Sequence, residues 1–571
     1  MFVHQKHSKN SYQMNLLLSL LILSVSIVSA TVEAKEISVQ KATDLACYYV
    51  NQKTTLRQGV SIKLAYTAPS SSCRGLTDYY AFNVGDNQGF ILVSADDAVA
   101  PILGWCMEGC FDLERMPSNL LFLLKGYQTE IAALRQVGTL YNEVSEVGLT
   151  QEEEVLLKTA VWGQGAAYNR YTPQVDGQST LTGCVAIAAG IIMHYHRYPD
   201  QVMDGILEYY GVPVDYEPIQ WSKMSYQTPW SETTQEAVGS LLWQIGANAN
   251  LTYGIKETTG RIDSVFYCMK NHFGYSCSAR LLVENALTEQ AWNDLLHAEI
   301  DAKRPVLYSA QDDQQSIGHA FVIDGYKGQN YYHVNWGWDG QFNGDFRLHA
   351  FDPNPNEHYN ANQIMCIGLQ PAKADDQPVG ELAYRLWKSD YRSGTTNFKI
   401  QLEVVNTGSS TFEGAVGIGL YKVGEANPKV ISGICKLQDL SEGVDVVSLT
   451  LDCLLEMPLE EGQIIRPVWQ DLNGQWHSMR QGKDQPWGIT FEGEVQDSPS
   501  VTAVSTPKSL VSWYVHDGGI TIDSQTPQSY RIFALQGKLL KDGIVNGRMI
   551  LPLAKGIYVL TIGALSYTVI I

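Results

Sequence analysis

Cys184 stands at a position where a polypeptide can make a thiol nucleophilic. It follows Gly183 and begins an apolar run of small residues over 184–196 that predicts a buried helix. The positive end of a helix dipole lowers the pKa of a thiol placed there, and the thiolate is the reactive form. A lone cysteine among apolar residues is usually core packing, so a catalytic interpretation depends on partners elsewhere in the chain.

A histidine and an asparagine at suitable places supply two such partners. His319 begins the apolar segment 318–325, which predicts a buried strand, and histidine is the commonest general base. Asn335 ends the next strand-like run sixteen positions later, which leaves room for a turn and an antiparallel neighbour. Its amide is expected to orient the imidazole, and Trp336 is expected to keep water away from that hydrogen bond.

Gln164 supplies a fourth group, twenty positions before Cys184 in a glycine-rich loop. Its side-chain N–H and the backbone N–H of Cys184 can together form an oxyanion hole for a tetrahedral acyl intermediate. The order Gln, Cys, His, Asn along the chain is that of papain-like proteases. The ten cysteines show no metal-ligand spacing, so neither a metal nor a cofactor is expected.

Composition bounds the class of protein. The 571 residues are too many for a single core, and 45% hydrophobic with 18% charged residues is typical of globular domains. A formal net charge of −20 excludes binding to nucleic acid through its phosphates, which requires a basic surface. No apolar run after the first 30 residues is long enough to predict a membrane span.

The first residues predict export. Lys6 and Lys9 precede the apolar segment 16–28, and residues 28–30 are small enough for a cleavage site. This pattern is typical of a signal peptide, and the mature protein is therefore expected to be secreted or held at the cell surface.

Changes of pattern along the chain predict five regions. The segment 31–150 alternates helical and strand-like runs, 151–371 has helices early and strands late, and 379–495 has clean β alternation typical of an Ig-like sandwich. The expected regions are a signal peptide (1–30), an α+β pro-domain (31–150), an α+β catalytic domain (151–371), a β-sandwich (379–495) and a C-terminal β-domain (510–571).

Three separated segments resemble the signatures of the streptopain family. They are TGCVA at 182–186, GHAFVIDG at 318–325 and HVNWGW at 333–338. The resemblance implies a secreted bacterial cysteine endopeptidase of papain-like α+β fold, with protein or peptide substrates. It implies Cys184 as nucleophile, His319 as base and acid, Gln164 as oxyanion donor, and Asn335 with Trp336 as the orienting pair.

Two further segments resemble parts of known exported proteins. Residues 82–85 and 89–104 are similar to the inhibitory pro-domain of the streptopain family, which implies a zymogen inhibited by its own N-terminal domain. Residues 517–522, 530–537 and 551–558 resemble the sorting domain that the type IX secretion machinery of Bacteroidetes recognises.

The chain departs from the streptopain pattern at two positions near the expected cleft. Ile317 stands where the family often has the first of two glycines before the histidine, and Asp339 stands where glycine is common. These departures concern loop shape and substrate preference more than the reaction itself.

Two other functions remain open from the sequence. An acyltransferase or transglutaminase would use the same residues with an amine in place of water. A non-catalytic adhesin or host-protein-binding protein would work through its β-domains and would leave the order of Gln, Cys, His and Asn unexplained.

Overall fold

The computed structural model describes residues 36–570, with gaps at 54–59, 71–74, 98, 138–153, 203, 312–317, 349–362, 423–426, 444, 496–510, 517–518, 535–538, 554–556 and 563–564. The chain divides into two compact units, one up to Gln496 and one from Asp497. The expected signal peptide lies outside the described residues.

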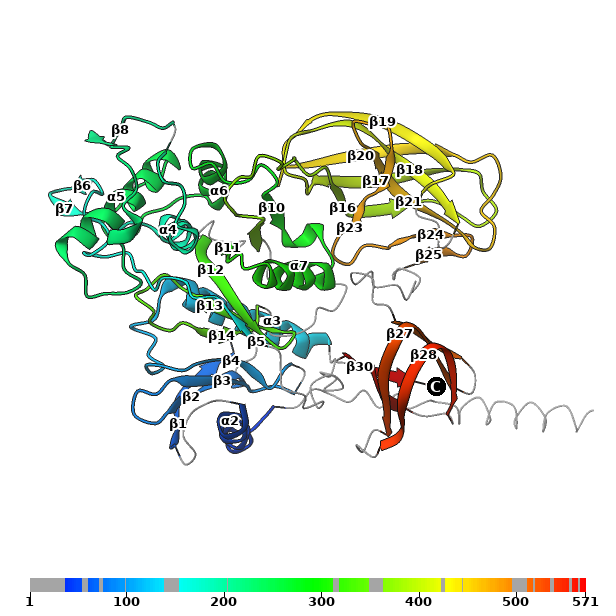
Figure 1. Ribbon diagram of the computed structural model, residues 1–571, viewed down its shortest axis with the longest axis horizontal. Helices are drawn as coiled ribbons and strands as arrows, with labels where there is room; N and C mark the ends of the chain where they lie inside the picture. The colour runs from blue at the N-terminus through cyan, green and yellow to red at the C-terminus, as the bar shows by residue number, and fades with distance from the viewer. Residues whose placement is uncertain are drawn as a thin grey trace, which may run out of the picture. The chain divides into compact units, whose positions relative to one another are not determined.

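The N-terminal part packs a four-stranded antiparallel meander between two helices (Figure 1). Alternate residues of its third strand face opposite ways, as β geometry requires. Ile91 and Val93 pack with the first helix, whereas Phe90 and Leu92 pack with the second. The elements are α2 (Val39–Lys53), β1 (Ile62–Pro69), β2 (Thr77–Val84), β3 (Phe90–Ser94), β4 (Ile102–Cys106) and α3 (Ser118–Val137).

The middle part adds helices and more strands to the same sheet. Its helices are α4 (Cys184–His196), α5 (Glu232–Asn248), α6 (Ile262–Asn271) and α7 (Glu289–Asp301), with short 3₁₀ turns η2 (Trp221–Lys223) and η3 (Glu284–Ala286). Its sheet strands are β5 (Glu154–Leu156), β10 (Arg280–Val283), β11 (Val306–Gln311), β12 (Gly318–Lys327), β13 (Tyr331–Asn335), β14 (Gly344–Phe346) and β15 (Ile364–Ile367). Two small hairpins are β6 (Gln174–Val175) with β7 (Gln178–Ser179), and β8 (Glu208–Tyr209) with β9 (Val212–Pro213).

One continuous sheet joins these two parts. Its order is β1-β2-β3-β4-β14-β13-β12-β11-β15-β10, with β5 paired to β12. The seam is the antiparallel pair β4–β14, in which Gly344 lies opposite Cys106. A Cβ at Gly344 would come within 2.3 Å of the Trp105 carbonyl oxygen, so the two strands can approach only because residue 344 is glycine.

Helix α4 is the centre of the middle part. Every residue from Val185 to His194 is buried, because α4 packs against β11 and β12 on one side and against α5 and α6 on the other. A helix covered on all sides must be apolar all round, which explains why its sequence lacks a polar face.

The third part is an all-β sandwich. One sheet has the order β20-β17-β16-β23 and the other β19-β18-β21-β24-β25, with β22 paired to β21. Ion pairs connect it to the middle part, including Arg280 to Glu381 at 2.7 Å and Lys270 to Glu442 at 3.2 Å. The strands are β16 (Leu382–Ser389), β17 (Asn397–Asn406), β18 (Phe412–Lys422), β19 (Val430–Leu440), β20 (Val446–Leu454), β21 (Gln463–Gln470), β22 (Trp476–Ser478), β23 (Arg480–Gln481), β24 (Gly488–Thr490) and β25 (Gly493–Val495).

The second compact unit is also all-β. Its five strands are β26 (Val511–His516), β27 (Gly519–Ala534), β28 (Leu539–Pro552), β29 (Ile557–Ile562) and β30 (Leu565–Ile570). They form one antiparallel sheet with a small core that includes Ile520, Ile522 and Ile532. The strand-rich α+β parts followed by all-β parts agree with the fold class expected from the sequence.

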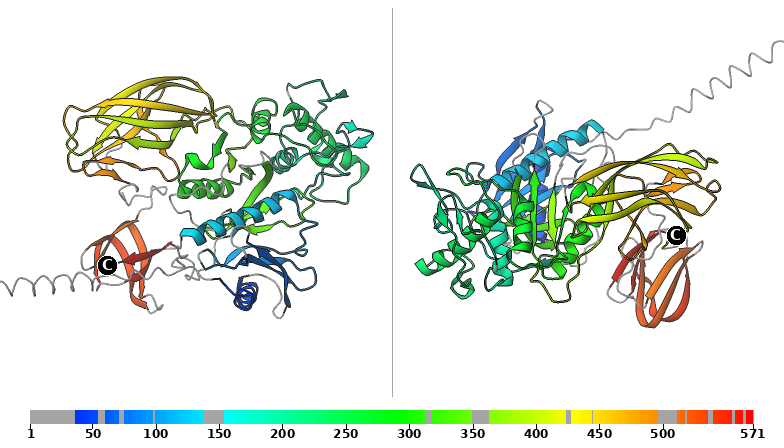
Figure 2. Two further views of the ribbon diagram at one scale, coloured as in Figure 1. Left: turned by 180° about the vertical axis from the view of Figure 1, so that it is seen from behind. Right: turned by 90° about the horizontal axis from the view of Figure 1, so that it is seen from above.

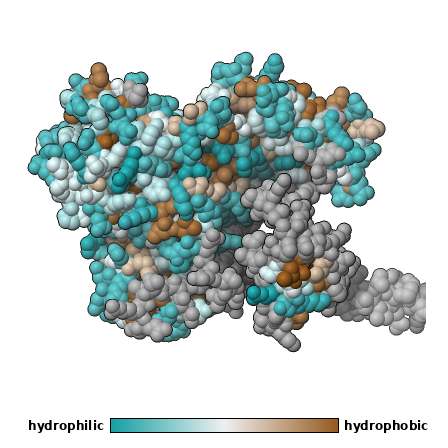
Figure 3. Space-filling view, viewed as in Figure 1, coloured by the Kyte–Doolittle hydropathy of each residue, from teal (hydrophilic) through white to brown (hydrophobic). Residues whose placement is uncertain are grey.

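Hydrophilic residues cover most of the described surface on the face that Figure 3 shows, with small separate hydrophobic patches between them. Within the described part of the chain, no helix is both long enough and apolar enough to cross a bilayer.

Candidate active site

Gly183 sets the entry into α4 and so the position of Cys184. Its backbone has φ +95° and ψ 139°, a conformation that L side chains rarely adopt. A Cβ at this position would lie 2.9 Å from Cγ2 of Thr258. Both the backbone angle and the close packing therefore require glycine immediately before the cysteine.

The thiol of Cys184 is partly buried at the N-terminus of α4. Burial raises its pKa, while hydrogen bonds from the backbone of Ala320, Val185 and Cys184 itself act in the opposite direction. The sequence predicted a net lowering by the helix dipole. That direction is wrong for the form of the protein described here, because the loss of hydration outweighs the helix amides.

His319 lies at the start of β12, next in the chain to Ala320, whose backbone acts to lower the pKa of the Cys184 thiol. The strand packs directly against α4, so the two elements that carry His319 and Cys184 are neighbours. Burial lowers the pKa of His319, and the carboxylate of Glu257 opposes this effect. With the thiol pKa raised and the imidazole pKa lowered, the pair is biased toward its neutral form.

Helix α3 of the N-terminal part contacts this histidine. Ser118 Oγ lies 3.3 Å from His319 Nδ1, and the ring of Phe122 lies 6.3 Å from the imidazole, centroid to centroid. Figure 2 shows α3, in cyan, beside the green strands of the sheet. No local pattern indicates these contacts, since the residues are about two hundred positions apart.

Asn335 ends β13, one strand over from His319, and its backbone pairs with Val322 of β12. Its side-chain N–H groups donate to Thr159 Oγ1 at 3.1 Å and to the Ala160 carbonyl at 2.9 Å. Its side-chain oxygen accepts from the Gly337 N–H at 3.2 Å. The carboxamide is thus fully engaged by the segment 159–160 and its own turn, and these bonds do not include the imidazole.

A buried polar chain continues from Thr159, and sequence reasoning missed it. The Thr159 hydroxyl donates to one carboxylate oxygen of Asp324, and the other lies 2.5 Å from His333 Nδ1. Burial lowers the pKa of His333, but the Asp324 carboxylate more than offsets this, and the net direction is upward. Asp324 and His333 both lie within the quoted sequence motifs, which was the only available signal.

The backbone of Gln164 contacts the segment that precedes the nucleophile. Its carbonyl oxygen accepts from both the N–H and the hydroxyl of Thr182, each at 3.2 Å. Thr182 is two residues before Cys184, so the Gln164 loop is fixed against the segment that enters α4.

Trp336 belongs to the core beneath the site. It is 1% exposed, its ring N–H donates to the Phe342 carbonyl at 2.9 Å, and it packs between Phe321 and Phe346. Its own carbonyl accepts from the side chain of Asn119 in α3 at 2.9 Å. The indole therefore supports the turn after Asn335, and the N-terminal part binds that turn directly.

Asp339, one of the two departures from the family pattern, links two loops of the site. It has φ +55°, its N–H donates to the Trp162 carbonyl at 3.0 Å, and its carboxylate accepts from the Tyr168 hydroxyl. The turn after Trp336 is thereby tied to the loop that carries Gln164. The other departure, Ile317, lies outside the described residues.

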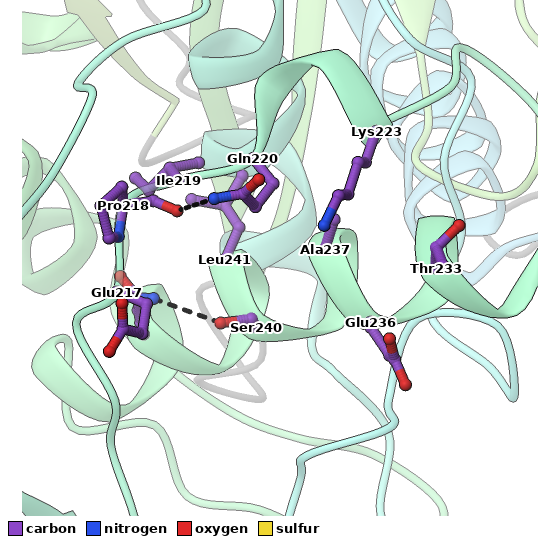
Figure 4. A pocket seen from close by; sticks show the side chains of 11 residues that line it. Glu217, Pro218, Ile219, Gln220, Lys223, Thr233, Glu236, Ala237, Ser240 and Leu241 are labelled. Atoms are coloured by element: carbon purple, nitrogen blue, oxygen red, sulfur yellow. Dashed lines mark hydrogen bonds between the residues drawn. The ribbon is translucent and has the colours of Figure 1, made fainter.

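A separate hollow of about 150 Å³ lies between the loop 217–223 and α5 (Figure 4). Glu217, Lys223 and Glu236 are among its lining residues, and neither Cys184 nor His319 is. Among the described residues, no group of three or more His, Cys, Asp or Glu side chains is arranged to hold a metal ion.

The end of the nucleophile helix makes the fold sensitive to acid. Burial, aided by Arg197 and Arg304 respectively, lowers the pKa of His194 and of His196 to about 4. The unfolded chain, with a histidine pKa near 6.5, binds more protons between these values, so the free energy of unfolding should fall as pH drops from about 6.5 to about 4. The loss for the nearly inaccessible His194 is of the order of 3 kcal/mol.

Urea unfolding of the full chain between pH 4 and 8 measures this effect. The variant His194→Phe, which keeps an aromatic ring between Trp162 and Tyr226, should flatten the pH dependence. Equal stability of the wild type at pH 5 and pH 7.5 would contradict the assignment.

Residues 162–346 match the model of the Peptidase C10 family, and residues 34–131 match that of the Spi protease inhibitor. These matches support a cysteine peptidase. The C10 match spans Gln164, Cys184, His319, Asn335 and Trp336, and the inhibitor match includes most of α3.

Relatives agree with this assignment at modest identity. The chain is 30% identical over 331 residues to the thiol protease/hemagglutinin PrtT of Porphyromonas gingivalis, which covers 52% of this chain and 37% of PrtT. It is 27% identical over 394 residues to streptopain of Streptococcus pyogenes, covering 62% of this chain and 98% of streptopain. The chain thus spans little more than a third of the length of PrtT.

Among solved structures, the chain is similar to a prointerpain A fragment of Prevotella intermedia. The TM-score is 0.46 and the identity 23%, and the match covers 55% of this chain and 99% of that one.

Proposed function

We propose that this chain is a secreted cysteine endopeptidase of papain-like fold, made as a zymogen. The observation that carries the proposal is the junction of α4 and β12, where Cys184 begins a helix that packs against the strand carrying His319. Thiol and imidazole so placed can form the nucleophile and base of acyl transfer.

The reaction follows from the roles of these groups. The Cys184 thiolate, paired with protonated His319, adds to the peptide carbonyl, and Gln164 with a backbone N–H stabilises the oxyanion. His319 then gives its proton to the leaving amine, and the C–N bond breaks to leave a thioester. Water, deprotonated by His319, attacks the thioester, releases the carboxylic acid and restores the thiol. Asn335 and Trp336 would hold the turn beside the histidine.

The N-terminal part would act as an intramolecular inhibitor. Its α3 occupies the imidazole side of the site through Ser118 and Phe122. Arg135, at the other end of α3, pairs with Asp78 at 2.6 Å and Asp96 at 2.5 Å, so the helix is anchored in the N-terminal sheet. Release of the whole N-terminal part would free His319 and relieve the burial that opposes its protonation.

The position of the processing site can be narrowed from the contacts of residues 154–160. Strand β5 pairs with β12, the Leu157 N–H donates to the Asp324 carbonyl at 2.7 Å, and Ala160 binds Asn335. These contacts hold residues 154–160 to the middle part and favour cleavage on the N-terminal side of them. The mature enzyme should therefore begin at or before Glu154.

The reaction is tested by following the full chain in reducing buffer. We expect a smaller mature form with an N-terminus at or before Glu154, and then cleavage of casein. A folded protein that neither matures nor cleaves casein would overturn the proposal. An acyltransferase would instead incorporate an added amine into its product, and an adhesin would do neither.

Export and sorting are part of the same proposal. The signal-peptide pattern at 1–30 and the similarity of 510–571 to type IX sorting domains support secretion through bacterial machinery that reads the C-terminal unit. Whether the enzyme is released or held at the surface depends on that unit.

Weakening the contact of α3 with His319 should shorten the time that the full chain takes to mature. In the double variant Ser118→Ala with Phe122→Ala, the inhibitory helix loses its hydrogen bond and its ring contact at His319. Each loss is worth about 1 kcal/mol, so the half-time of maturation should fall roughly thirtyfold. Time-resolved gel electrophoresis of the full chain measures it.

The control for this variant lies on the same helix. Thr129 is exposed, and its hydroxyl bonds only back to the Lys125 carbonyl among the contacts described. Thr129→Ala should leave the half-time unchanged. If the Ser118 and Phe122 double variant also matures at the wild-type rate, α3 does not restrain the site.

A further inference from the structure

The loop 252–259 is tightly folded and held by its own hydrogen bonds. Thr252 and Thr259 form an antiparallel bridge with two backbone hydrogen bonds of 2.8 and 2.9 Å. Inside it, the Gly254 N–H donates to Thr258 Oγ1 at 3.2 Å. A Cβ at Gly254 would come within 2.3 Å of the Glu257 carbonyl oxygen, so glycine allows the turn to close.

This loop is fixed to the residues that precede the nucleophile. The Thr258 hydroxyl donates to the Leu181 carbonyl at 2.6 Å, and the Leu181 N–H donates to the Gly254 carbonyl at 3.1 Å. The Thr258 methyl group packs against Gly183. Thr258 therefore contacts Gly183, the residue before Cys184, and the backbone of Glu257 is held next to Thr258.

Glu257 itself differs from its buried neighbour Thr258, because its side chain is exposed. Its carboxylate acts on His319 and favours the charged imidazole. Within the described residues, Glu257 is the one charged group with an influence on the pKa of His319, and no ion pair to it is found there. An exposed carboxylate thus lies on a loop that is fixed to the residues before Cys184, and it acts on His319.

We propose that Glu257 is a specificity-determining residue that selects substrates with a basic side chain close to the scissile bond. The inference rests on the proposed peptidase function and deepens it by naming the substrate class. An exposed carboxylate held on this loop attracts a lysine or arginine side chain of the substrate and repels an aspartate or glutamate. Since the group is exposed, each effect has the size of a surface ion pair, about threefold in kcat/KM.

Charge selection is distinguishable from a general electrostatic effect on the imidazole. A carboxylate that only stabilises protonated His319 would change kcat/KM by the same factor for every peptide and would shift the pH profile. A carboxylate that contacts the substrate changes the ratio between peptides of different charge. The ratio therefore tests the proposal independently of the absolute rate.

The experiment uses the mature enzyme with fluorogenic peptides that differ only by Lys, Gln or Glu at one position, scanned on both sides of the scissile bond. At one or more positions the wild type should prefer Lys over Glu by roughly tenfold at low salt, and the preference should shrink at high salt. In Glu257→Gln the ratio should approach one, and in Glu257→Lys it should invert. Glu217→Gln, a matched change at an exposed carboxylate outside the site, should keep the wild-type ratio.

Three results would overturn the inference or its basis. If Glu257→Gln keeps the wild-type preference for Lys over Glu peptides, Glu257 does not determine specificity. A wild type that cleaves all peptides without charge preference refutes the substrate class and leaves the peptidase function standing. A wild type that cleaves none of the peptides and no casein overturns the proposed function itself.

Discussion

The variant Cys184→Ala should remain at full length indefinitely and should not cleave casein. The substitution removes only the sulfur atom, at the first residue of α4, and leaves the buried residues 185–194 and the contacts of α3 in place. Without a nucleophile no thioester can form, and loss of a triad nucleophile costs at least about a thousandfold in rate. Thermal unfolding should remain close to that of the wild type.

A second cysteine provides the control for that experiment. Cys277 is exposed and lies outside the site, so Cys277→Ala should mature and cleave casein normally. Maturation of Cys184→Ala at the wild-type rate, in the absence of any other protease, would show that another residue carries the reaction. Wild-type enzyme added in trace amounts would reveal whether the Cys184→Ala chain can be processed by another molecule.

Local sequence patterns were enough to predict which helix and which strand carry the residues that the reaction would need. Cys184 and His319 could be placed at element starts because glycine, apolar runs and strand patterns are local signals. The contacts that hold these residues could not be predicted in the same way. Ser118 meets His319, and Thr258 meets Gly183, across long separations that only the folded chain brings together.

The direction in which the pKa of the Cys184 thiol is shifted also could not be predicted from local sequence. The helix amides at Cys184 lower the pKa as expected, but burial is the larger effect and has the opposite sign. Burial depends on every element packed around the sulfur, including β12, and cannot be computed from neighbours in the sequence. The orientation of the Asn335 amide was unpredictable for a similar reason, since Thr159 and Ala160 lie 175 or more positions away.

Sheet order was equally hidden. Nothing local in the sequence indicates that β4 and β14 pair and so join the N-terminal and middle parts in one sheet. Glycine is required at position 344 only because the backbone of Trp105 and Cys106 lies opposite it in the folded chain. In an edge-to-edge joint of this kind, separation of the N-terminal part must break a strand ladder as well as the α3 contacts.

Gly183→Ala should reduce the rate of maturation about a hundredfold without unfolding the protein. An alanine at φ +95° costs of the order of 1–3 kcal/mol in backbone strain, which a domain of this size can absorb. Its Cβ would also meet Cγ2 of Thr258 at 2.9 Å, so the entry to α4 must shift. A displacement of the nucleophile by a fraction of an ångström to 1 Å has an effect of that size on rate.

Two further variants separate strain from displacement. Gly177, in the β6–β7 hairpin, has φ +73° with no atom near a new Cβ, so Gly177→Ala introduces positive-φ strain without a new contact and should mature normally. Thr258→Ser removes the clashing methyl group but keeps the hydroxyl that bonds Leu181. Combined with Gly183→Ala, it should restore at least a tenth of the wild-type rate. If the double variant is no faster than Gly183→Ala alone, backbone strain rather than contact with Thr258 positions the nucleophile.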